Sequence, residues 1–284
     1  MTKLVYTQPV DYFVKVSVCS LTQCLDEHDF TITVDTVKIE TILNRIPNDT
    51  RFIVFPEYSY NDDLYQLYRN YSDQNNCIVI GGSGLQENAD SSLYAFCPVF
   101  IPNTELIKVY KKHITVPETV ISGGRLRNYT DDIQRLIVID LNGFSITFSV
   151  YVCYDFIRES KDYRADIVFI PQFELSPDTY ISHGDDTVKK HRNFVVGCNN
   201  ANGRSIGFAI INNSIINGLH IGSYRSPNYI DANQKFLMHH HTVIYDTMEE
   251  KIITMNLNLG CPFSLPFNIY NQPVIIPTGI ITIP

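Results

Sequence analysis

The chain has little positive charge, no long apolar run and no closely spaced cysteine pair. Its 22 lysines and arginines are outnumbered by 30 aspartates and glutamates, which gives a formal net charge of -8. Binding to phosphate backbones depends on clustered lysine and arginine, so this balance argues against nucleic acid as a direct ligand. No segment approaches the roughly 18 consecutive apolar residues of a membrane-spanning helix. The N-terminal MTKLVYTQPVDYF also lacks the apolar stretch of a signal peptide, so we expect a cytoplasmic protein.

Metal-binding patterns are scarce as well. The cysteines number seven and are scattered over positions 19, 24, 77, 97, 153, 198 and 261. None belongs to a CxxC pair, and an odd, dispersed set is typical of reduced thiols in a reducing compartment. In the run of three histidines, only His239 and His241 could share an ion, because successive residues of a strand point to opposite faces. We expect no metal site.

The chain contains enough hydrophobic residues to form a large core. The chain has 284 residues, of which 44% are hydrophobic. Apolar runs and amphipathic spacing predict strands at 14–21, 51–57 and 77–84 that alternate with helices at 34–46 and 64–71. This β-α-β-α-β order indicates parallel strands with helices on the faces of the sheet.

The pattern changes in the second half of the chain. Apolar segments that follow residue 90 are joined by short, turn-rich connections, which is typical of antiparallel hairpins. Further strands are predicted at 164–172, 193–200 and 205–216. No proline- or serine-rich linker divides the chain. We therefore expect a mixed α/β fold in a single domain over 1–284, with 225–284 as a less certain C-terminal extension.

Three places carry reactive side chains at the ends of apolar segments. Glu57 ends RFIVFPE, Lys111 and Lys112 end ELIKVYKK, and Cys153 ends FSITFSVYVC. Taken alone, each of these residues is more typical of a residue without catalytic function, because glutamate and lysine are usually exposed and an unpaired cysteine usually packs in the core. Together they supply a base, a cation and a nucleophile, which is the set that a thioester mechanism needs.

These three motifs resemble those of the nitrilase, or carbon-nitrogen hydrolase, superfamily. The similar segments are FPE at Glu57, the tyrosine-x-lysine segment that begins at Tyr110, and VCYD at Cys153. Further similarity lies in ADIVFIPQ at 165–172 and in KKHRNFVVGCNNANG at 189–203. The resemblance covers roughly residues 14–216 in the family's order. Each motif is short, and the specificity comes from their combination.

The resemblance implies a four-layer α-β-β-α sandwich and a thiol hydrolase that uses neither metal nor organic cofactor. Glu57 would take the proton of Cys153, which would attack an amide, nitrile or carbamoyl carbon of a small molecule. Lys112, helped by the backbone N–H of Tyr154, would stabilise the oxyanion, and Glu118 would orient the lysine. A sandwich of this kind is also expected to pair into a homodimer or a larger homo-oligomer.

The sequence departs from the family's pattern at the lysine. The family's lysine is usually followed by x-His-Leu, whereas His113 directly follows Lys112 here. Counting from His113 selects Lys111, and counting from Tyr110 selects Lys112; the ungapped match of NTELIKVY favours Lys112. FIRES after the cysteine and the absence of tryptophan also depart from the family and indicate a different substrate-facing loop.

Other functions stay open at this point. A papain-like hydrolase would pair Cys153 with His183 or His191 and an orienting asparagine. A catalytically silent sandwich could serve as a binding or assembly module. An acyltransferase would use the same thioester with an amine in place of water. GGSG at 81–84 lacks the Lys-Ser/Thr of a phosphate loop and predicts a turn.

Overall fold

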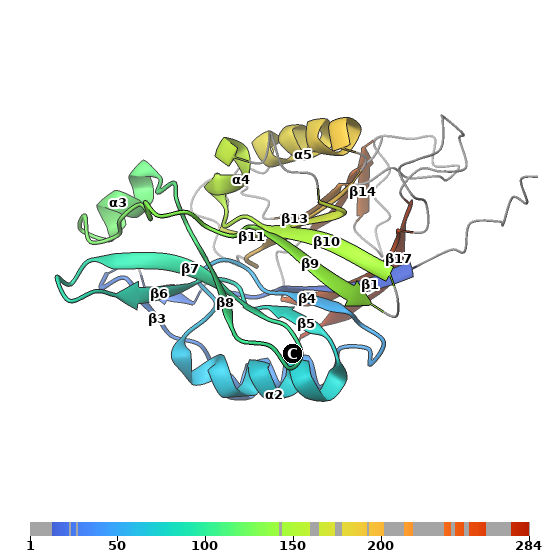
Figure 1. Ribbon diagram of the computed structural model, residues 1–284, viewed down its shortest axis with the longest axis horizontal. Coiled ribbons are helices and arrows are strands. Elements are labelled where there is room, and N and C mark those ends of the chain that lie inside the picture. The colour runs from blue at the N-terminus through green and yellow to red at the C-terminus, as the bar shows by residue number, and fades with distance from the viewer. Residues whose placement is uncertain are drawn as a thin grey trace, which may run out of the picture.

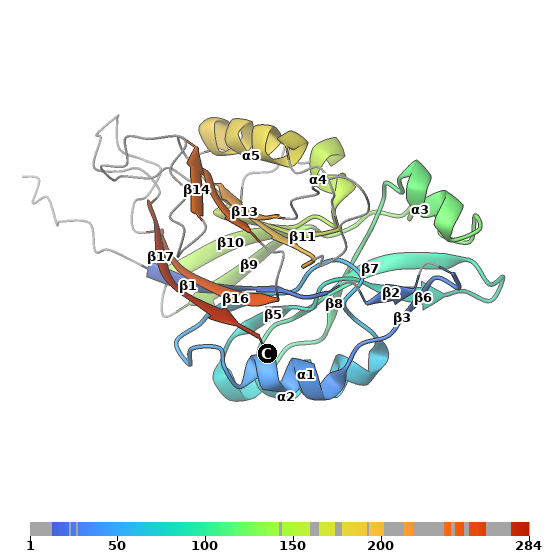
Figure 2. The ribbon, with the colours of Figure 1, turned by 180° about the vertical axis from the view of Figure 1, so that it is seen from behind.

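The computed structural model describes residues 13–22, 24–26, 28–141, 144–159, 165–173, 178–191, 193–201, 213–217, 236–239, 242–246, 250–259 and 274–283. Two stacked β-sheets form its centre, and helices cover their outer faces (Figures 1 and 2). Within these residues no helix is long and apolar enough to cross a membrane. The two stacked sheets with helices on their outer faces confirm the α-β-β-α sandwich that the sequence predicted.

The first sheet contains the early strands and also the end of the chain. Its order is β17-β16-β1-β4-β5-β7-β6, with β8 paired to β7. The bounds are β1 Phe13–Ser20, β4 Phe52–Val54, β5 Ile78–Ile80, β6 Gly84–Glu87, β7 Leu93–Phe100, β8 Ile107–Tyr110, β16 Lys251–Asn258 and β17 Val274–Thr282. Strands β1, β4 and β5 are parallel, as the β-α-β-α-β order predicted. Strand β16 pairs with β1 along its whole length, so a late segment is an inner strand of this sheet.

The second sheet contains most of the later strands. Its order is β14-β15-β13-β12-β11-β10-β9. The bounds are β9 Leu136–Leu141, β10 Phe144–Val150, β11 Ile167–Gln172, β12 Phe194–Asn199, β13 Asn213–Asn217, β14 Phe236–His239 and β15 Thr242–Asp246. Strands β10, β11 and β12 are parallel, and the others pair antiparallel. A separate two-stranded ribbon joins β2 Leu25–Asp26 to β3 Thr31–Ile32.

Four helices of the described chain cover the two outer faces of the sandwich, and one lies at its end. Their bounds are α1 Thr36–Leu43, α2 Tyr65–Asn75, α3 Val116–Ile121, α4 Tyr154–Glu159 and α5 Asp178–His191, with a short 3-10 turn at Asp62–Leu64. Helices α1 and α2 lie under the first sheet, α4 and α5 lie over the second, and α3 lies at the end of the sandwich beside β7 (Figures 1 and 2). The Asp35 side chain caps α1 by accepting the N–H of Lys38, and Asn76 ends α2 in the left-handed conformation.

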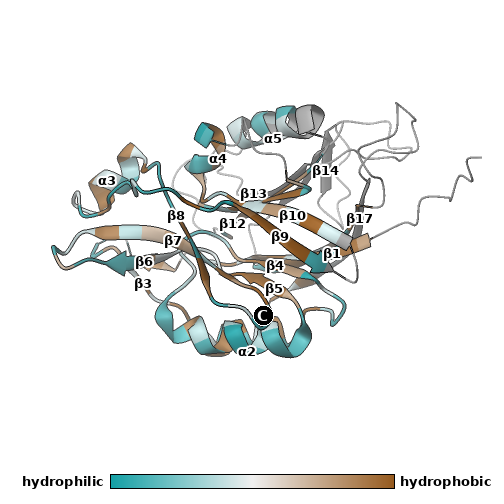
Figure 3. Cartoon of the chain, viewed as in Figure 1, coloured by the Kyte–Doolittle hydropathy of each residue, from teal (hydrophilic) through white to brown (hydrophobic). Residues whose placement is uncertain are grey.

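Alternation along the strands builds the layers of the core. Phe52 and Val54 of β4 belong to the core between the sheets, whereas Ile53 between them packs toward α1 and α2. In β11, Phe169 likewise faces the other sheet, whereas Val168 packs toward α4 and α5. Both faces of these strands are buried, which explains their continuous apolar runs. Figure 3 shows hydrophobic strands at the centre and a hydrophilic outer surface on α2.

The carboxyl ends of the inner strands are connected across the two sheets. The Glu57 N–H, three residues after β4, donates to the carbonyl of Gln172 at the end of β11 (3.2 Å). The Asn200 side chain, just after β12, donates to the carbonyl of Glu57 (3.3 Å). In open α/β sheets, sites form beyond the carboxyl ends of the strands. The candidate residues therefore lie at this end of the sandwich.

Two sequence predictions lie partly outside the described residues. The strand expected over 205–216 is described only as β13, over Asn213–Asn217. The His239 and His241 pair also falls outside, because the structure describes only the backbone of His239 and does not describe His241.

Candidate active site

Glu57 lies on a tight turn that follows β4, and its side chain is 1% exposed. Tyr58 beside it has a positive φ of 56°, and the Tyr58 N–H donates to the Ser83 hydroxyl (2.9 Å). Burial raises the pKa of the Glu57 carboxyl to about 7, although Lys111 lowers it. A carboxyl that titrates near neutral pH can both accept and return a proton, which is what a general base requires.

Lys111 is completely buried between two carboxylates. Its Nζ donates to Glu57 Oε1 (2.8 Å) and to Glu118 Oε1. Burial alone would lower the pKa of the lysine, but Glu118 and Glu57 together raise it well above its usual range. The ammonium therefore stays charged throughout the physiological pH range and provides a fixed cation inside the protein.

The structure places Lys111 between the two carboxylates, and not Lys112, which the sequence favoured. Val109 of β8 faces the core between the sheets, and Lys111, two residues later, continues on that side of the strand. Lys112 is half-buried, and its backbone N–H donates to the Asp155 carboxylate (3.0 and 3.1 Å). The structure thus agrees with the alignment that counts from His113 and selects Lys111. It disagrees with the ungapped alignment at Tyr110, which selects Lys112.

Glu118 uses its two oxygens for two different tasks. Oε2 accepts the N–H and the hydroxyl of Thr115 (both 2.8 Å) in a capping box that begins α3. Oε1 accepts the Lys111 ammonium and the Tyr58 hydroxyl. Burial alone would raise the pKa of Glu118, but Lys111 and Tyr58 lower it overall. Glu118 is therefore the ionised partner of the lysine, which leaves Glu57 as the carboxyl that titrates near neutral pH.

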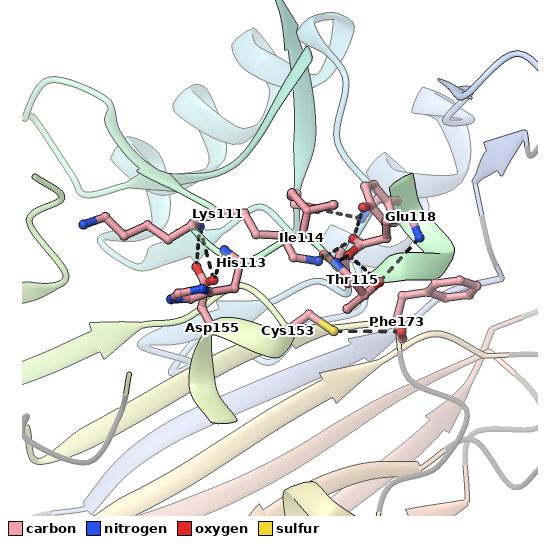
Figure 4. Close-up of polar contacts among 12 residues, drawn as sticks. Lys111, His113, Ile114, Thr115, Glu118, Cys153, Asp155 and Phe173 are labelled. Carbon is pink, nitrogen blue, oxygen red and sulfur yellow. Dashed lines mark hydrogen bonds and ion pairs between the residues drawn. The ribbon is translucent and has the colours of Figure 1, made fainter. Parts of the chain in front are cut away.

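Cys153 lies on a turn between β10 and α4, with a positive φ of 46°. Such a conformation is strained for a residue with a side chain, and it is common at functional sites. The thiol contacts the Phe173 carbonyl (3.9 Å) and the Tyr180 hydroxyl (3.3 Å), and Figure 4 shows the sulfur pointing toward Phe173. Burial raises the pKa of this thiol well above its ordinary value, Glu57 raises it further, and Lys111 lowers it.

Tyr154 supplies a further donor beside the sulfur. It is the first residue of α4, and the first N–H groups of a helix have no acceptor within that helix. The neighbouring N–H groups are engaged: that of Cys153 donates to Pro171 (2.9 Å), and that of Asp155 donates to Val152 (3.1 Å). The backbone N–H of Tyr154 is thus the group at this turn that can meet an oxyanion.

Asp155 connects the cysteine turn to the lysine segment. Its carboxylate accepts the backbone N–H groups of Lys112 and His113, and Figure 4 shows it directly beside that segment. The Arg135 guanidinium donates to Asp155 (2.8 Å) and to Glu159 (2.7 Å). Burial raises the pKa of Asp155, although Arg135 opposes this shift. The network holds Lys111 and Cys153 in a fixed relation.

The same cluster has the residue types of a metal site. His113, Asp155 and Glu159 present ligand atoms that lie within 4.8 Å of one another. However, the Arg135 guanidinium already donates to both carboxylates, and the His113 ring is 2.8 Å from Glu159. A guanidinium in this position supplies the positive charge that a cation would bring. We interpret the cluster as an ion-pair network.

A buried primary amide lies next to the site. Gln172 is 1% exposed, and neither of its side-chain polar atoms has a hydrogen-bond partner in the described part of the chain. Its side chain follows Val168 and Ile170 along β11 on the side that faces α4 and α5. Unpaired buried amides are rare in proteins and often mark a functional site.

The structure also places residues of the alternative interpretations. The His183 ring packs edge-on against Phe156 (4.8 Å), and Tyr180 of the same helix contacts the Cys153 sulfur. The side chain of His191 lies outside the described residues. The GGSG segment forms the turn that supports Glu57, through the Ser83 hydroxyl.

Sequence reasoning did not find Tyr58, Arg135 or Tyr180. Tyr58 directly follows the FPE motif, so the motif indicated that this segment belongs to the site. It gave no sign that the Tyr58 hydroxyl donates to Glu118. Arg135 lies 20 residues before Asp155 in a segment without a motif, and only the fold shows their pairing. Tyr180 lies in an amphipathic helix, where an aromatic residue is typical of the core.

Comparisons with known proteins agree with this geometry at the level of the fold. No protein-family profile matches the sequence, and no curated protein matches it. The structure is similar to Saccharomyces cerevisiae Nit3, a member of branch 10 of the nitrilase superfamily, with a TM-score of 0.52 and 16% identity over 85% of this chain and 92% of that chain. It is similar to XC1258 from Xanthomonas campestris, a CN-hydrolase superfamily protein with an arsenic adduct in the active site, with a TM-score of 0.54 and 12% identity over 83% and 91%.

An amidase gives a third comparison. The nitrilase-superfamily amidase of Nesterenkonia AN1, in a variant that carries the acetamide moiety of fluoroacetamide on its active-site cysteine, matches with a TM-score of 0.53 and 13% identity. That match covers 82% of this chain and 90% of the amidase. The resemblance noted in the motifs is thus matched by the arrangement of the whole sandwich. The chain has the fold of the nitrilase superfamily.

Proposed function

We propose that the protein is a thiol hydrolase that cleaves a non-peptide carbon-nitrogen bond of a small amide, nitrile or carbamoyl compound. The observation that carries the proposal is the buried Lys111 ammonium, which lies 2.8 Å from Glu57 and is also bound to Glu118, at the strand ends where Cys153 sits. A charged lysine held between two carboxylates beside a thiol is costly to bury, and electrostatic stabilisation of a transition state is a physical reason to keep it.

The first half of the reaction forms a thioester. The Glu57 carboxylate takes the thiol proton of Cys153, and the sulfur electron pair attacks the carbonyl or nitrile carbon. The negative charge that develops on the substrate oxygen or nitrogen meets the Lys111 ammonium and the Tyr154 N–H. For an amide, Glu57 then returns the proton to the departing nitrogen, and the carbon-nitrogen bond breaks. For a nitrile, Glu57 returns the proton to the nitrogen of the resulting thioimidate, which adds one water molecule and loses ammonia to give the same thioester.

The second half releases the acid. Glu57 accepts a proton from water, the hydroxide oxygen attacks the thioester carbon, and the same two donors stabilise the oxyanion again. The carbon-sulfur bond then breaks, and the sulfur recovers its proton from Glu57. Because Glu57 titrates near pH 7, it can serve as base and acid in alternation. If an amine replaces water, the same thioester leads to acyl transfer.

The test is a search for the thioester itself. Intact-protein mass is measured at short times after mixing the chain with a panel of small amides, nitriles and carbamoyl compounds. We expect an acyl adduct that Cys153→Ala abolishes and that a control variant at a half-buried cysteine, Cys24→Ala, retains. No adduct from any class, with a Cys153 thiol no more reactive than the other cysteines, would favour a silent binding module.

The proposal includes a homodimer or larger assembly in the cytoplasm that does not bind nucleic acid. The described cysteines Cys19, Cys24, Cys77, Cys97, Cys153 and Cys198 are all free thiols, which suits a reducing compartment. The net charge of -8 opposes binding to phosphate backbones. Light scattering should give at least twice the chain mass of 32.5 kDa, and a monomer would contradict the assembly.

A further inference from the structure

The environment of the Cys153 sulfur contains more groups that oppose a thiolate than groups that favour it. Glu57 and Glu118 are carboxylates whose charge raises the pKa of the thiol, and the Phe173 carbonyl is an acceptor. On the favourable side, the Lys111 ammonium lowers that pKa, but it donates its hydrogen bonds to the Glu57 and Glu118 carboxylates. A thiolate at this place therefore needs a further hydrogen-bond donor.

Tyr180 is placed to be that donor. Its hydroxyl oxygen lies 3.3 Å from the Cys153 sulfur, and both side chains are 4% exposed. The residue comes from the first turn of α5, on the side of the sulfur that faces the helical layer, and its ring stacks on Phe156 of α4 (6.5 Å). The ring contact fixes the direction of the hydroxyl, so the donor is already in position before the thiol loses its proton.

We propose that Tyr180 is a catalytic residue whose hydroxyl hydrogen-bonds the Cys153 sulfur and stabilises it as the attacking and as the leaving thiolate. This inference rests on the thioester chemistry proposed above. When Glu57 takes the thiol proton, the electron pair stays on sulfur, and the Tyr180 O–H donates to it without giving up its own proton. When the thioester forms, sulfur loses its negative charge and the hydrogen bond weakens. When the carbon-sulfur bond breaks, the bond is restored.

A purely structural role would have a different consequence. If Tyr180 only filled space, its ring would matter and its oxygen would not. The substitution Tyr180→Phe keeps the ring that stacks on Phe156 and removes only the oxygen. Tyr68 provides a matched control, because its hydroxyl is buried without a partner among the described residues, in the core beneath the first sheet. Tyr68→Phe therefore makes the same chemical change away from the sulfur.

The measurement is the rate at which iodoacetamide alkylates Cys153, followed against pH by peptide mapping so that other cysteines do not contribute. This readout needs no substrate. In Tyr180→Phe we expect the rate at neutral pH to fall about tenfold and the pH profile of Cys153 to move to higher pH, because a hydrogen bond to a charged group is lost. Tyr68→Phe should keep the wild-type profile.

A second substitution guards against a folding defect. Incorporation of 3-fluorotyrosine at position 180 keeps the ring and makes the hydroxyl a stronger donor, so the profile of Cys153 should move to lower pH. Glu57, Lys111 and Glu118 are unchanged in all of these variants. Opposite shifts from phenylalanine and fluorotyrosine would support the hydrogen bond, since damage to the fold would move both variants in the same direction.

The acyl-adduct measurement separates this inference from the proposed function. If the wild-type chain forms the adduct and Tyr180→Phe alkylates and acylates at the wild-type rate at every pH, the role of Tyr180 is overturned and the hydrolase proposal stands. If the wild-type chain forms no adduct, the hydrolase proposal and the catalytic role of Tyr180 fall together, and the alkylation profiles then report only on the hydrogen bond.

Discussion

The carboxylate of Asp155 accepts the backbone N–H of His113 at 2.7 Å, and through this bond the helix that follows the nucleophile holds the segment that carries the lysine. The same carboxylate binds the N–H of Lys112 and the guanidinium of Arg135. The position of Lys111 relative to Cys153 therefore depends on a residue that does not touch the sulfur. Asp155 is a positioning residue.

Replacing Asp155 with alanine should destabilise the protein strongly. The substitution removes one of the two carboxylates that pair with Arg135, which is 2% exposed, and it leaves the backbone N–H groups of Lys112 and His113 without their acceptor. Breaking a buried ion pair costs about 3–5 kcal/mol. The exposed pair of Lys15 and Asp49 offers a control, because Asp49→Ala should cost at most about 1 kcal/mol. Urea unfolding of both variants gives the comparison, and equal losses would contradict the role of Asp155.

The two adjacent lysines should differ sharply in their effect on activity. Lys111→Met removes the cation that the proposed mechanism places at the oxyanion, and loss of one such donor lowers the rate by about 10²–10³. Lys112→Met removes a half-buried side chain whose backbone contact with Asp155 remains, so the rate should stay close to that of the wild type. The rate of acyl-adduct formation on Cys153 measures both variants. A slow Lys112→Met with a normal Lys111→Met would reverse the assignment.

Activity should rise with pH through the titration of Glu57. Burial raises the pKa of this carboxyl from 4.5 to about 7, so the base is mostly protonated at pH 6 and mostly ionised at pH 8. The acidic limb of the activity profile should therefore lie near pH 7, and Glu57→Gln should lose it together with nearly all activity. A limb near pH 4 to 5 in the wild type would show that Glu57 is not the base.

Stability should change with pH in the opposite direction. Because the folded-state pKa of Glu57 lies above its ordinary value, the folded protein binds this proton more tightly than the unfolded chain. The resulting stabilisation is complete below pH 4.5 and is lost as pH rises through about 7. The glutamine in Glu57→Gln cannot ionise, so this variant does not lose that stabilisation. The free energy of unfolding of the variant, relative to that of the wild type, should therefore increase between pH 5 and pH 8. Denaturant midpoints at several pH values measure the difference.

The sequence predicted much of the site because its signals are local. Glu57 and Cys153 each follow an apolar strand, so the sequence could place each of them beyond the carboxyl end of a strand, where sites of α/β folds form. The two strands belong to different sheets, and the stacking of the sheets brings their ends together. Glu118 was predicted from the resemblance alone, as the residue that orients the lysine, and the structure places it in the first turn of α3, in a capping box with Thr115. Local patterns of this kind survive in a single sequence without any knowledge of the three-dimensional fold.

The errors came from relations that are not local. The choice between Lys111 and Lys112 depends on the register of one strand, and a shift of one residue turns the side chain to the opposite face. The pairing of Arg135 with Asp155 and the contact of Tyr180 with Cys153 join residues that are 20 and 27 positions apart in the chain. These contacts depend on how α4 and α5 pack on the second sheet, which no spacing in the sequence specifies.

Two glycines with nearly equal backbone angles should respond very differently to alanine. Gly82 has a φ of +79°, and a Cβ there would lie 2.2 Å from the Pro56 carbonyl oxygen and from the Ser59 hydroxyl. Gly124 has a φ of +75°, with no atom within 4 Å of such a Cβ. The backbone strain of a left-handed alanine, about 1 kcal/mol, is common to both, whereas the clash belongs to Gly82 alone.

Because Pro56 and Ser59 flank Glu57, the clash at Gly82 has to move the turn that holds the proposed base. Gly82→Ala should therefore lower both the free energy of unfolding and the rate of acylation of Cys153, while Gly124→Ala should lower only the former, by about 1 kcal/mol. Unfolding curves and acyl-adduct rates on the two variants test this. Equal effects on acylation would mean that the position of Glu57 does not depend on the Gly82 turn.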